Sequence, residues 1–504
     1  MLRVCKELFC RWNDAEIKYC HWKSNEHLSE GLDGLTDLDV FVLPEDRSAA
    51  EQLLAQTEYI KFVPQKGARY PRVCEWIGFD GDTGKLVHVH LHYEIITGTK
   101  FSKEYVFPIG DQVIATRVLD PETQVYIAAP EMETLILYSR IALKAKDKKS
   151  IEPDDGYKKE LSYLKERSDP EKVREICSAF MAADGVRLAA MTEKGSLSHK
   201  EWYEVYRAVY RWLKNHKTMS DLTAKCRKKY FIYRSLLQHI IKKYLHYTPI
   251  RRKTPPAGGM TVCFIGADGS GKSTVSNEIK KWLNWKIEAE RFYLGSGDHY
   301  NGFLKRIIAT GRRIGGGSSS KSGSQSVNGG GDGKKKKPSL KRRILVFGFE
   351  LLQSVYLRQI AERSLKELKK AHKYASRGGI AILDRFPQDQ FTGMYDGPKI
   401  RVRYPDGGRF IRNQAKREER AVARAQKYQP ELMFKLLLPP EESVRRKPEH
   451  TLAEVAPKAE ITAKLVFGKS RVIDVDATQS YDSELIEIKR CVWRQLLYAT
   501  YGEK

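Results

Sequence analysis

Apolar and polar positions follow a different pattern in the two halves of the chain. After residue 260, five apolar runs of strand length occur, reading TVCFIGAD, ERFYLG, GIAILDRF, FKLLLP and RVIDVD. Segments with apolar residues at helical spacing separate these runs. Strands that are apolar on both faces and alternate with helices are typical of a parallel sheet covered by helices. We therefore predict an α/β domain with a five-stranded parallel sheet over residues 260–504.

The first half divides into a mixed part and a helical part. Within residues 1–128, DLDVFV predicts a strand, residues 49–56 a helix, and VCEWIGF and KLVHVHLHYEII a hairpin around the turn DGDTG. Residues 129–247 carry helical patterns throughout, beginning with PEMETLILYSRIALKAK. The segment 248–259, TPIRRKTPPAGG, lacks an apolar period and contains Pro, Gly and charge. It predicts a linker between a mixed α/β first half and the C-terminal domain.

A low-complexity insertion interrupts the second half at residues 315–343. It contains GGGSSSKSGSQSVNGGGDGKKKKP, which has too few large apolar side chains to offset the entropy of ordering, so we predict disorder. Basic residues crowd its end, directly before ILVFGFELLQSVYL. Because Glu350 and Gln353 interrupt that apolar run, we predict a helix packed on the sheet. Contact with an anionic membrane surface is the alternative.

Composition narrows the class of protein without choosing a partner. A chain of 504 residues exceeds one ordinary core, so two or three domains are expected. The net charge of +26 favours polyanions: nucleic acid, an anionic membrane or phosphorylated substrates. The cysteines show no C-x-x-C spacing, which indicates reduced thiols in a cytoplasmic protein. Without a long apolar run or an apolar signal core, neither a transmembrane span nor secretion is predicted.

The strongest chemical signal is GADGSGKST, which follows the first apolar run of the second half. A Gly-rich turn between a strand and a helix points backbone N–H groups inward, and the helix N-terminus adds positive potential where phosphates bind. Lys272 would reach the β and γ phosphates, and the Ser273 hydroxyl would ligate Mg²⁺. This predicts binding of ATP or GTP. The loop residues expected around the phosphates are Gly266, Gly269, Ser270, Gly271, Lys272, Ser273 and Thr274.

Two further motifs of the second half carry charge at strand ends. GIAILDRF places Asp384 and Arg385 after a fully apolar strand, beside the phosphate loop if the sheet is parallel. Asp384 could hold the Mg²⁺ shell, and Arg385 could neutralise a transferring or accepting phosphate. PPEESVRRKPEH places Arg445 and Arg446 after the fourth strand, where mobile lids close over phosphates. A solvated charge cluster is the alternative there.

Together these motifs resemble the thymidylate kinase family of nucleoside monophosphate kinases. The resemblance rests on GADGSGKST, LDRF and PPEESVRR, and it spans most of residues 260–500. It implies that Asp268 faces the acceptor substrate, that Arg385 holds the acceptor phosphate and that residues 474–480 contact the adenine. It also implies lid roles for Arg445 and Arg446. YLGSGDHY and PQDQFTG depart from the family's substrate elements, so the acceptor is a nucleoside monophosphate or another small phosphorylated metabolite.

A second chemical signal lies in the first half, at Asp37 and Asp39. Side chains two apart in a strand share a face, so both carboxylates would project together, as divalent metal binding requires. With Ser24 in a preceding turn, the pattern resembles the polymerase β type nucleotidyltransferase superfamily. That resemblance implies a third carboxylate on a later strand and two metals that activate an attacking hydroxyl.

The later strand offers imidazoles where that resemblance would place an acid. His88, His90, His92 and Glu94 would share one face of it. Either Glu94 or a histidine completes a metal site, or the domain has the fold without transferase activity. The alternative without a chemical role is that the two aspartates end a turn and the histidines form a solvent-exposed face.

These observations favour an ATP- and Mg²⁺-dependent phosphotransferase that acts on a small phosphorylated acceptor. One alternative is a nucleic-acid end-processing protein, in which the first half transfers nucleotides and the basic charge holds the strand. The other is a regulatory ATPase whose only acceptor is water. The sequence leaves the oligomeric state open.

Overall fold

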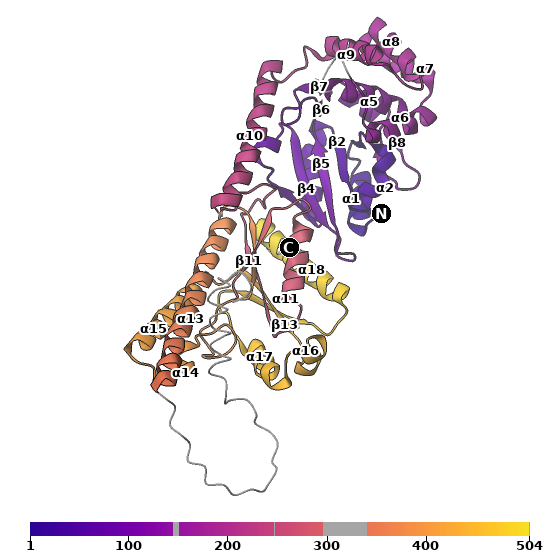
Figure 1. Ribbon diagram of the computed structural model, residues 1–504. Helices are drawn as coiled ribbons and strands as arrows, with labels where there is room; N and C mark the ends of the chain where they lie inside the picture. Colours follow the sequence, from indigo (N-terminus) through magenta and orange to yellow (C-terminus); the bar gives the residue numbers. More distant parts are fainter. Residues whose placement is uncertain (145–150, 246, 296–339, 503–504) are drawn as a thin grey trace. The chain divides into compact units, whose positions relative to one another are not determined.

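The computed structural model describes residues 1–144, 151–245, 247–295 and 340–502 (Figure 1). The chain splits into two compact units. The first unit comprises Met1–Ala257, Lys286–Glu288 and Lys489–Lys504. The second unit comprises Gly258–Trp285 and Ala289–Ile488. The insertion predicted to be disordered at residues 315–343 lies outside the described residues up to residue 339, and its last residues, 340–343, form the beginning of the helix Leu340–Ala375 instead.

A mixed seven-stranded sheet organises the first unit, in the order β3-β4-β5-β2-β1-β9-β8. Its strands are β1 (Tyr19–His21), β2 (Asp37–Val42), β3 (Tyr59–Phe62), β4 (Val73–Phe79), β5 (Leu86–His92), β8 (Val118–Leu119) and β9 (Tyr126–Ile127). β4 and β5 form the antiparallel hairpin that the sequence predicts, and β2 runs parallel to β5. Two short strands, β6 (Ile95–Thr97) and β7 (Tyr105–Phe107), form a separate pair.

The helices of the first unit share a core with its sheet. They are α1 (Arg3–Asp14), α2 (Leu28–Leu32), α3 (Arg47–Gln56), α4 (Gly110–Ala115), α5 (Pro130–Lys144), α6 (Asp155–Arg167), α7 (Pro170–Met181), α8 (Ala183–Thr192), α9 (His199–Leu213) and α10 (Asp221–Leu245). Trp22, directly after β1, and Phe41 of β2 lie in one buried cluster with Leu135 of α5 and Trp202 of α9. The helical region expected at 129–247 therefore belongs to the same compact unit as residues 1–128.

The C-terminal residues also belong to the first unit, although the sequence analysis assigns them to the domain beginning at 260. α18 (Tyr481–Tyr501) carries Trp493, which is fully buried. Its indole lies 6.2 Å from Phe62 and 5.8 Å from Phe79 between ring centroids, and its Nε1 donates to the carbonyl of Glu58 at 3.1 Å. This aromatic contact is the physical reason for the difference.

The second unit is built on the predicted five-stranded parallel sheet, which the structure confirms. The strand order is β11-β12-β10-β13-β14, and the paired strands all run parallel. Their bounds are β10 (Thr261–Gly266), β11 (Ala289–Tyr293), β12 (Ile380–Asp384), β13 (Leu432–Leu437) and β14 (Arg471–Asp476). Phe264 and Phe434 stack on adjacent strands with centroids 5.2 Å apart. All five carboxyl ends therefore meet at one edge of the sheet.

Helices α11 (Lys272–Leu283), α13 (Leu340–Ala375), α14 (Ile400–Arg403), α15 (Arg409–Ala425), α16 (Pro440–Arg446), α17 (Leu452–Lys464) and the first part of α18 complete the second unit. Figure 1 shows α13, α14 and α15 side by side. α16 and α17 follow β13 and lie apart from those three.

α13 carries an apolar run, ILVFGFELLQSVYL, near its beginning and many charged residues after it. Within the described residues, Ile344–Ala375 is the one helical stretch whose length and composition would allow a bilayer crossing, with a mean hydropathy of 1.2 in its best window. Near its beginning, Ile344 and Phe347 are exposed, whereas Leu368 and Tyr374 near its end are buried. The end of α13 therefore packs in the second unit as the sequence predicts, and its beginning does not.

Candidate functional site

The phosphate loop joins β10 to α11 in the conformation that its glycines permit. Gly269 and Gly271 have φ values of +86° and +83°, in the left-handed region that side chains with a Cβ rarely adopt. A Cβ on Gly266 would lie 2.4 Å from the Ser270 hydroxyl and 2.8 Å from the carbonyl of Leu436. Each of the three glycines is therefore required by local geometry.

Lys272 is the first residue of α11, and its side chain turns into the loop. Only 6% of it is exposed, and its Nζ donates to the carbonyl of Ala267 at 2.5 Å and to the Ser270 hydroxyl at 3.5 Å. Burial, helped by the nearby charge of Arg385, lowers the pKa of Lys272 to about 8. A poorly solvated ammonium group inside a Gly-rich loop is suited to polyphosphate binding.

A hydroxyl and a carboxylate meet beside this lysine. Ser273 Oγ donates to Asp384 Oδ2 at 2.8 Å, which joins the start of α11 to the end of β12. Arg291 of β11 also contacts Oδ2, whereas Asp384 Oδ1 is buried without a hydrogen-bond partner among the described residues. An orphaned carboxylate oxygen next to a serine hydroxyl fits Mg²⁺, which prefers oxygen ligands. Ser273 and Asp384 are therefore the residues that would hold it.

Arg385 follows directly and takes a strained backbone conformation. Its φ of +75° lies in the left-handed region, which costs a residue with a Cβ about 1–3 kcal/mol. Its guanidinium lies 3.4 Å from Asp268 and 3.6 Å from Asp396, and the charge of Asp396 is the main cause of its raised pKa. These ion pairs are long, so the guanidinium remains available to a further anion.

Asp268 of the phosphate loop also pairs with a lysine from another helix. Lys458 of α17 contacts Asp268 Oδ2 at 2.5 Å. Burial alone would raise the pKa of Asp268, but the hydrogen bond and charge of Lys458, with Arg385, lower it to about 2. Two cations, Arg385 and Lys458, therefore converge on one loop carboxylate.

The two lid arginines expected from the sequence lie on α16 after β13, and in this conformation they make an ion pair within that helix. Arg445 and Arg446 end α16 and both pair with Glu442, at 2.6 Å and 2.9 Å from their Nε atoms. Arg446 also donates to the carbonyl of Ala477 at 2.9 Å. From the same helix, Ser443 Oγ donates to the carbonyl of Asp268. Ser443 and Lys458, rather than the arginines, therefore connect α16 and α17 to the phosphate loop.

Tyr395 hydrogen-bonds to the beginning of the phosphate loop at Gly266. Its hydroxyl accepts from Gly266 N at 2.6 Å and donates to Gly266 O at 2.7 Å. The side chain is buried and its backbone has a φ of +51°. The segment after β12 is therefore fixed to the base of the phosphate loop.

A cleft of about 660 Å³ opens at the carboxyl ends of β13 and β14. It is lined by Ala267 of the loop, by side chains of α17 and by Asp474, Asp476 and Thr478. The last three belong to the segment 474–480 that the resemblance places near an adenine. The cleft is large enough for a drug-sized ligand.

The comparisons with known proteins agree with a nucleotide site of this kind. No protein-family model matches the chain. Over 240 residues, 46% of this chain and 86% of the relative, the chain is 30% identical to the uncharacterized ATP-binding protein YghR of Escherichia coli K12. The chain belongs to the YghR family. The uncharacterized ATP-binding protein YghS of the same strain is 25% identical over 243 residues, 48% of this chain and 92% of YghS.

Among solved structures, a deoxyadenosine kinase from M. mycoides with bound dATP matches 46% of this chain and 99% of its own chain. The sequence identity is 16% and the TM-score is 0.27. A superposition of this quality assigns no residue and no substrate to the present member of the YghR family.

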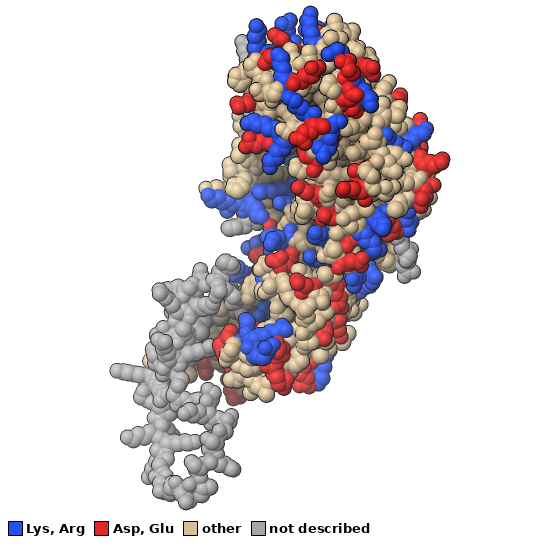
Figure 2. All heavy atoms as spheres, turned by 90° about the vertical axis from the view of Figure 1, so that its right-hand side faces the viewer, with Lys and Arg blue, Asp and Glu red and all other residues tan. Residues whose placement is uncertain are grey.

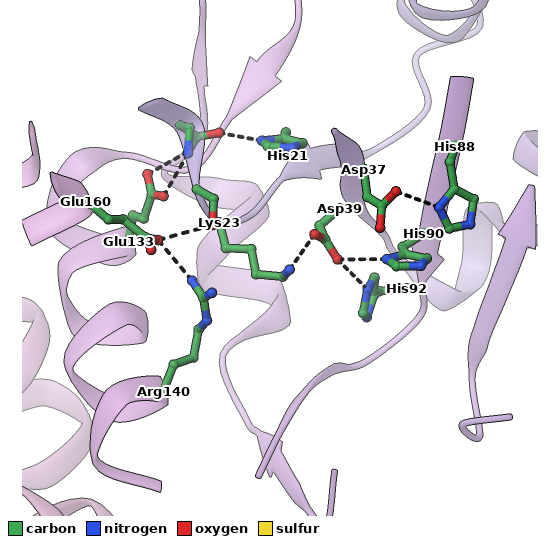
Figure 3. A network of polar contacts seen from close by, with 12 residues as sticks. His21, Lys23, Asp37, Asp39, His88, His90, His92, Glu133, Arg140 and Glu160 are labelled. Carbon is green, nitrogen blue, oxygen red and sulfur yellow. Dashed lines mark hydrogen bonds and ion pairs between the residues drawn. The ribbon is translucent and has the colours of Figure 1, made fainter. Parts of the chain in front are cut away.

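In this member of the YghR family, the first unit holds a second cluster of chemical groups (Figure 3). β2 and β5 pair so that Asp37 lies opposite His88 and Asp39 opposite His90. His88 Nδ1 lies 2.8 Å from Asp37 Oδ1, while Asp39 Oδ1 lies 3.4 Å from His90 Nδ1 and 3.2 Å from His92 Nε2. The two carboxylates therefore face different imidazoles instead of converging on one all-oxygen site.

Lysines and a third acid complete this cluster. Lys286 contacts Asp37 Oδ1 at 2.5 Å, and Lys23 contacts Asp39 Oδ2. Glu75 of β4 lies 2.7 Å from His88 Nε2 and 3.1 Å from His90 Nε2. Glu94, one of the residues considered for completing the site, pairs with Arg72 instead, because it lies beyond the end of β5.

The turn after β1 leads to a separate acidic group. Ser24 has a φ of +58°, and the next residue, Asn25, donates from its backbone and side chain to Glu133 at 3.0 Å and 2.6 Å. Arg140 pairs with Glu160 at 2.9 Å nearby. Burial, with the charge of Glu160, raises the pKa of Glu133 to about 7. Hydrogen bonds and an ion pair hold this region together.

Several functional groups of the structure are absent from the sequence prediction. Glu75 is a lone charge within an apolar strand run, a signal that could have singled it out, whereas Arg291 lies beside Glu290 and carries a weaker signal. Lys458 and Tyr395 carry no such signal, because a lysine in an amphipathic helix and a tyrosine in a loop are ordinary. Only the tertiary contacts reveal them.

Proposed function

We propose that this chain is an ATP- and Mg²⁺-dependent phosphotransferase that acts on a nucleoside monophosphate or a related small phosphorylated acceptor. The observation that carries the proposal is the convergence of Arg385 and Lys458 on Asp268, inside the phosphate loop. A protein that only binds or hydrolyses a nucleotide needs the phosphate loop with its lysine. It does not need two further cations, Arg385 and Lys458, beside the loop. Such a pair is suited to a phosphate on an acceptor.

The residues divide into those that would hold the donor and those that would hold the acceptor. Lys272 stabilises negative charge on the β and γ phosphates, and Ser273 and Asp384 would hold Mg²⁺, which supplies further charge neutralisation when bound. Arg385 positions the acceptor phosphate for in-line attack. Asp268 keeps Arg385 and Lys458 oriented until the acceptor replaces it as their partner.

ATP as the donor is supported by the printed names of YghR and YghS, which are ATP-binding proteins. The acceptor class is supported by the thymidylate-kinase-like motifs and by the cleft beside the loop. ATP is abundant in the cytoplasm, and the cysteines of the described residues are all free, so we propose that the protein acts there.

The proposal is tested by measuring transfer of labelled γ-phosphate from ATP with Mg²⁺. The acceptors are nucleoside monophosphates, sugar phosphates, short oligonucleotides and water, and the Lys272→Ala protein is the blank. We expect transfer to a phosphorylated small molecule. An Arg385→Ala variant should then raise the KM for the acceptor while leaving the affinity for ATP near its original value. Phosphate release to water alone would refute the acceptor assignment and favour a regulatory ATPase.

A nucleic-acid end-processing enzyme is the second candidate, and α10 is the element that favours it. Tyr230, Tyr233 and Tyr244 are exposed on this helix among lysines and arginines, a combination found where bases stack on aromatic rings. On the face drawn in Figure 2, however, basic and acidic side chains are interspersed. Phosphate transfer to oligonucleotide ends, with affinity that falls steeply with salt, would favour this candidate.

A further inference from the structure

In the first unit, two histidines and one aspartate bring together three atoms that could bind one metal ion. Asp39 Oδ1, His90 Nδ1 and His92 Nε2 all lie within 4.8 Å of one another. Asp39 comes from β2 and the histidines from the adjacent strand β5, where residues two apart share a face. A regular sheet therefore holds all three groups.

The spacing of these atoms matches the ligand separations around a metal ion, although 3.2 Å is also within hydrogen-bond range. A tetrahedral ion about 2.0–2.1 Å from each ligand holds neighbouring ligand atoms roughly 3.3–3.4 Å apart. The two distances from Asp39 Oδ1 are 3.4 Å to His90 and 3.2 Å to His92. The neighbouring His88 lies 2.8 Å from Asp37 and 2.7 Å from Glu75, which are ordinary hydrogen-bond lengths.

The groups around the three ligands would hold them in position. Glu75 Oε2 lies 3.1 Å from His90 Nε2, so it can accept the proton there and leave Nδ1 unprotonated toward the ion. Lys253 and His88 in turn contact the same carboxylate of Glu75. A carboxylate behind a ligating imidazole is the usual arrangement at metal sites.

An ion could reach this site from solvent, and its ligands would favour some metals over others. The His90 side chain is 23% exposed, whereas His92 is fully buried, so an ion can approach from the His90 side. Lys23 occupies Asp39 Oδ2 and leaves Oδ1 to the imidazoles. Two imidazoles with one carboxylate suit Zn²⁺ and similar transition metals rather than Mg²⁺, which prefers oxygen ligands.

We propose that Asp39, His90 and His92 bind Zn²⁺ or a similar transition-metal ion, with a fourth coordination position open to water or a ligand oxygen. The proposal is independent of the phosphate-loop assignment, because no residue of the second unit takes part. One expectation from the sequence is that Glu94 or a histidine completes a metal site with Asp37 and Asp39, and the proposal narrows that set to Asp39 and two histidines.

The first test is a titration of the chelator-treated full-length protein with Zn²⁺ against a chromophoric chelator. We expect one tight equivalent. Changes outside the ligand shell commonly weaken metal binding about 10- to 100-fold, so His90→Ala should weaken it at least that much. His27→Ala is the matched control, because His27 is a 42% exposed imidazole beside Glu26 and Glu30 of the same unit. An unchanged affinity in His90→Ala, or an equal loss in His27→Ala, would overturn the proposal.

The second test needs no variant, and so does not depend on whether a substitution folds. Crystals soaked in Zn²⁺ should give an anomalous difference peak between Asp39 Oδ1, His90 Nδ1 and His92 Nε2. A Zn²⁺ peak found only elsewhere would refute the site. Among the described residues, the competing positions are the group of Asp37, His88 and His90 and the group of Glu26, Glu133 and Glu160.

Discussion

In the proposed function Lys272 needs its proton to neutralise phosphate, and its burial makes that proton easier to lose. Its pKa falls from 10.5 to about 8 because of burial and the charge of Arg385. The protonated form binds polyphosphate, so the Kd for ATP should rise as pH increases above about 8, by up to about tenfold per pH unit. Isothermal titration from about pH 7 to pH 9.5 checks this.

The same shift has the opposite sign for folding. Between about pH 8 and pH 10.5 the unfolded chain binds the Lys272 proton and the folded chain does not, so this residue's contribution to stability rises with pH. Weaker ATP binding at high pH would therefore not reflect unfolding at this site. A Lys272→Arg variant, whose charge does not titrate in this range, should show a flatter dependence of Kd on pH. A flat Kd in the parent protein would contradict the assignment.

Removal of the Lys272 ammonium should abolish phosphate transfer without unfolding the protein. Lys272→Ala deletes the ammonium group that enters the phosphate loop, so we expect kcat/KM to fall by at least about 10²-fold, as when a single transition-state donor is lost. Lys281→Ala is the control, because that side chain lies on the same helix and is 81% exposed. Circular dichroism should be unchanged in both. A fully active Lys272→Ala protein would refute the loop assignment.

At the scale of single elements, the hydrogen bonds that hold the phosphate loop to the segment after β12 can be tested with one substitution. Tyr395→Phe removes both hydrogen bonds to Gly266 and leaves buried backbone groups without that partner. We expect a loss of about 1–3 kcal/mol in the free energy of unfolding, measured by urea denaturation of the second unit. Tyr481→Phe, at a 43% exposed position, should change it little. Equal stability of Tyr395→Phe and the parent would show that Tyr395 does not support the loop.

The strands of the second unit could be predicted because their sequence pattern is local. The central strands β10 and β12 are short runs that are apolar and buried on both faces, and GADGSGKST must lie between such a strand and a helix. The position of Lys458 could not be predicted, because it depends on how α17 packs toward Asp268 from 190 residues away.

The two lid arginines show the same limit of prediction. Their motif places Arg445 and Arg446 on α16, as the structure has them. Sequence alone cannot separate phosphate binding from local pairing with Glu442, which lies about one helical turn away from both. Only the contacts of the folded helix show which of the two occurs in this conformation.

The histidine face of β5 shows what alternation can and cannot reveal. Period-two spacing places His88, His90 and His92 together, as the sequence analysis expects. It does not reveal that Glu75 from β4 contacts two of these imidazoles, nor that Glu94 pairs with Arg72. Those facts depend on strand register and on where the strand ends.

At the scale of the whole chain, the first unit depends on residues far from its own segment. Trp493→Ala would empty a fully buried indole site against Phe62 and Phe79. We expect a loss of about 3–5 kcal/mol in the unfolding free energy of the first unit, followed by chemical denaturation. Tyr498→Ala, at a 52% exposed position of the same helix, is the control and should lose about 0.5 kcal/mol or less. Similar stabilities of the two variants would contradict this packing.

These long-range contacts affect the order in which parts of the chain fold during synthesis. Domains usually fold from the N-terminus as synthesis proceeds. Here the hydrogen bonds from Trp493 to Glu58 and from Tyr501 to Tyr59 join positions far apart in the chain, with separations of 435 and 442 residues. The ribosome must therefore synthesise the chain through α18 before the first unit can complete its core. Until then, the rings of Phe62 and Phe79 lack the packing of Trp493. A nascent chain stalled before α18 would expose them to chaperones.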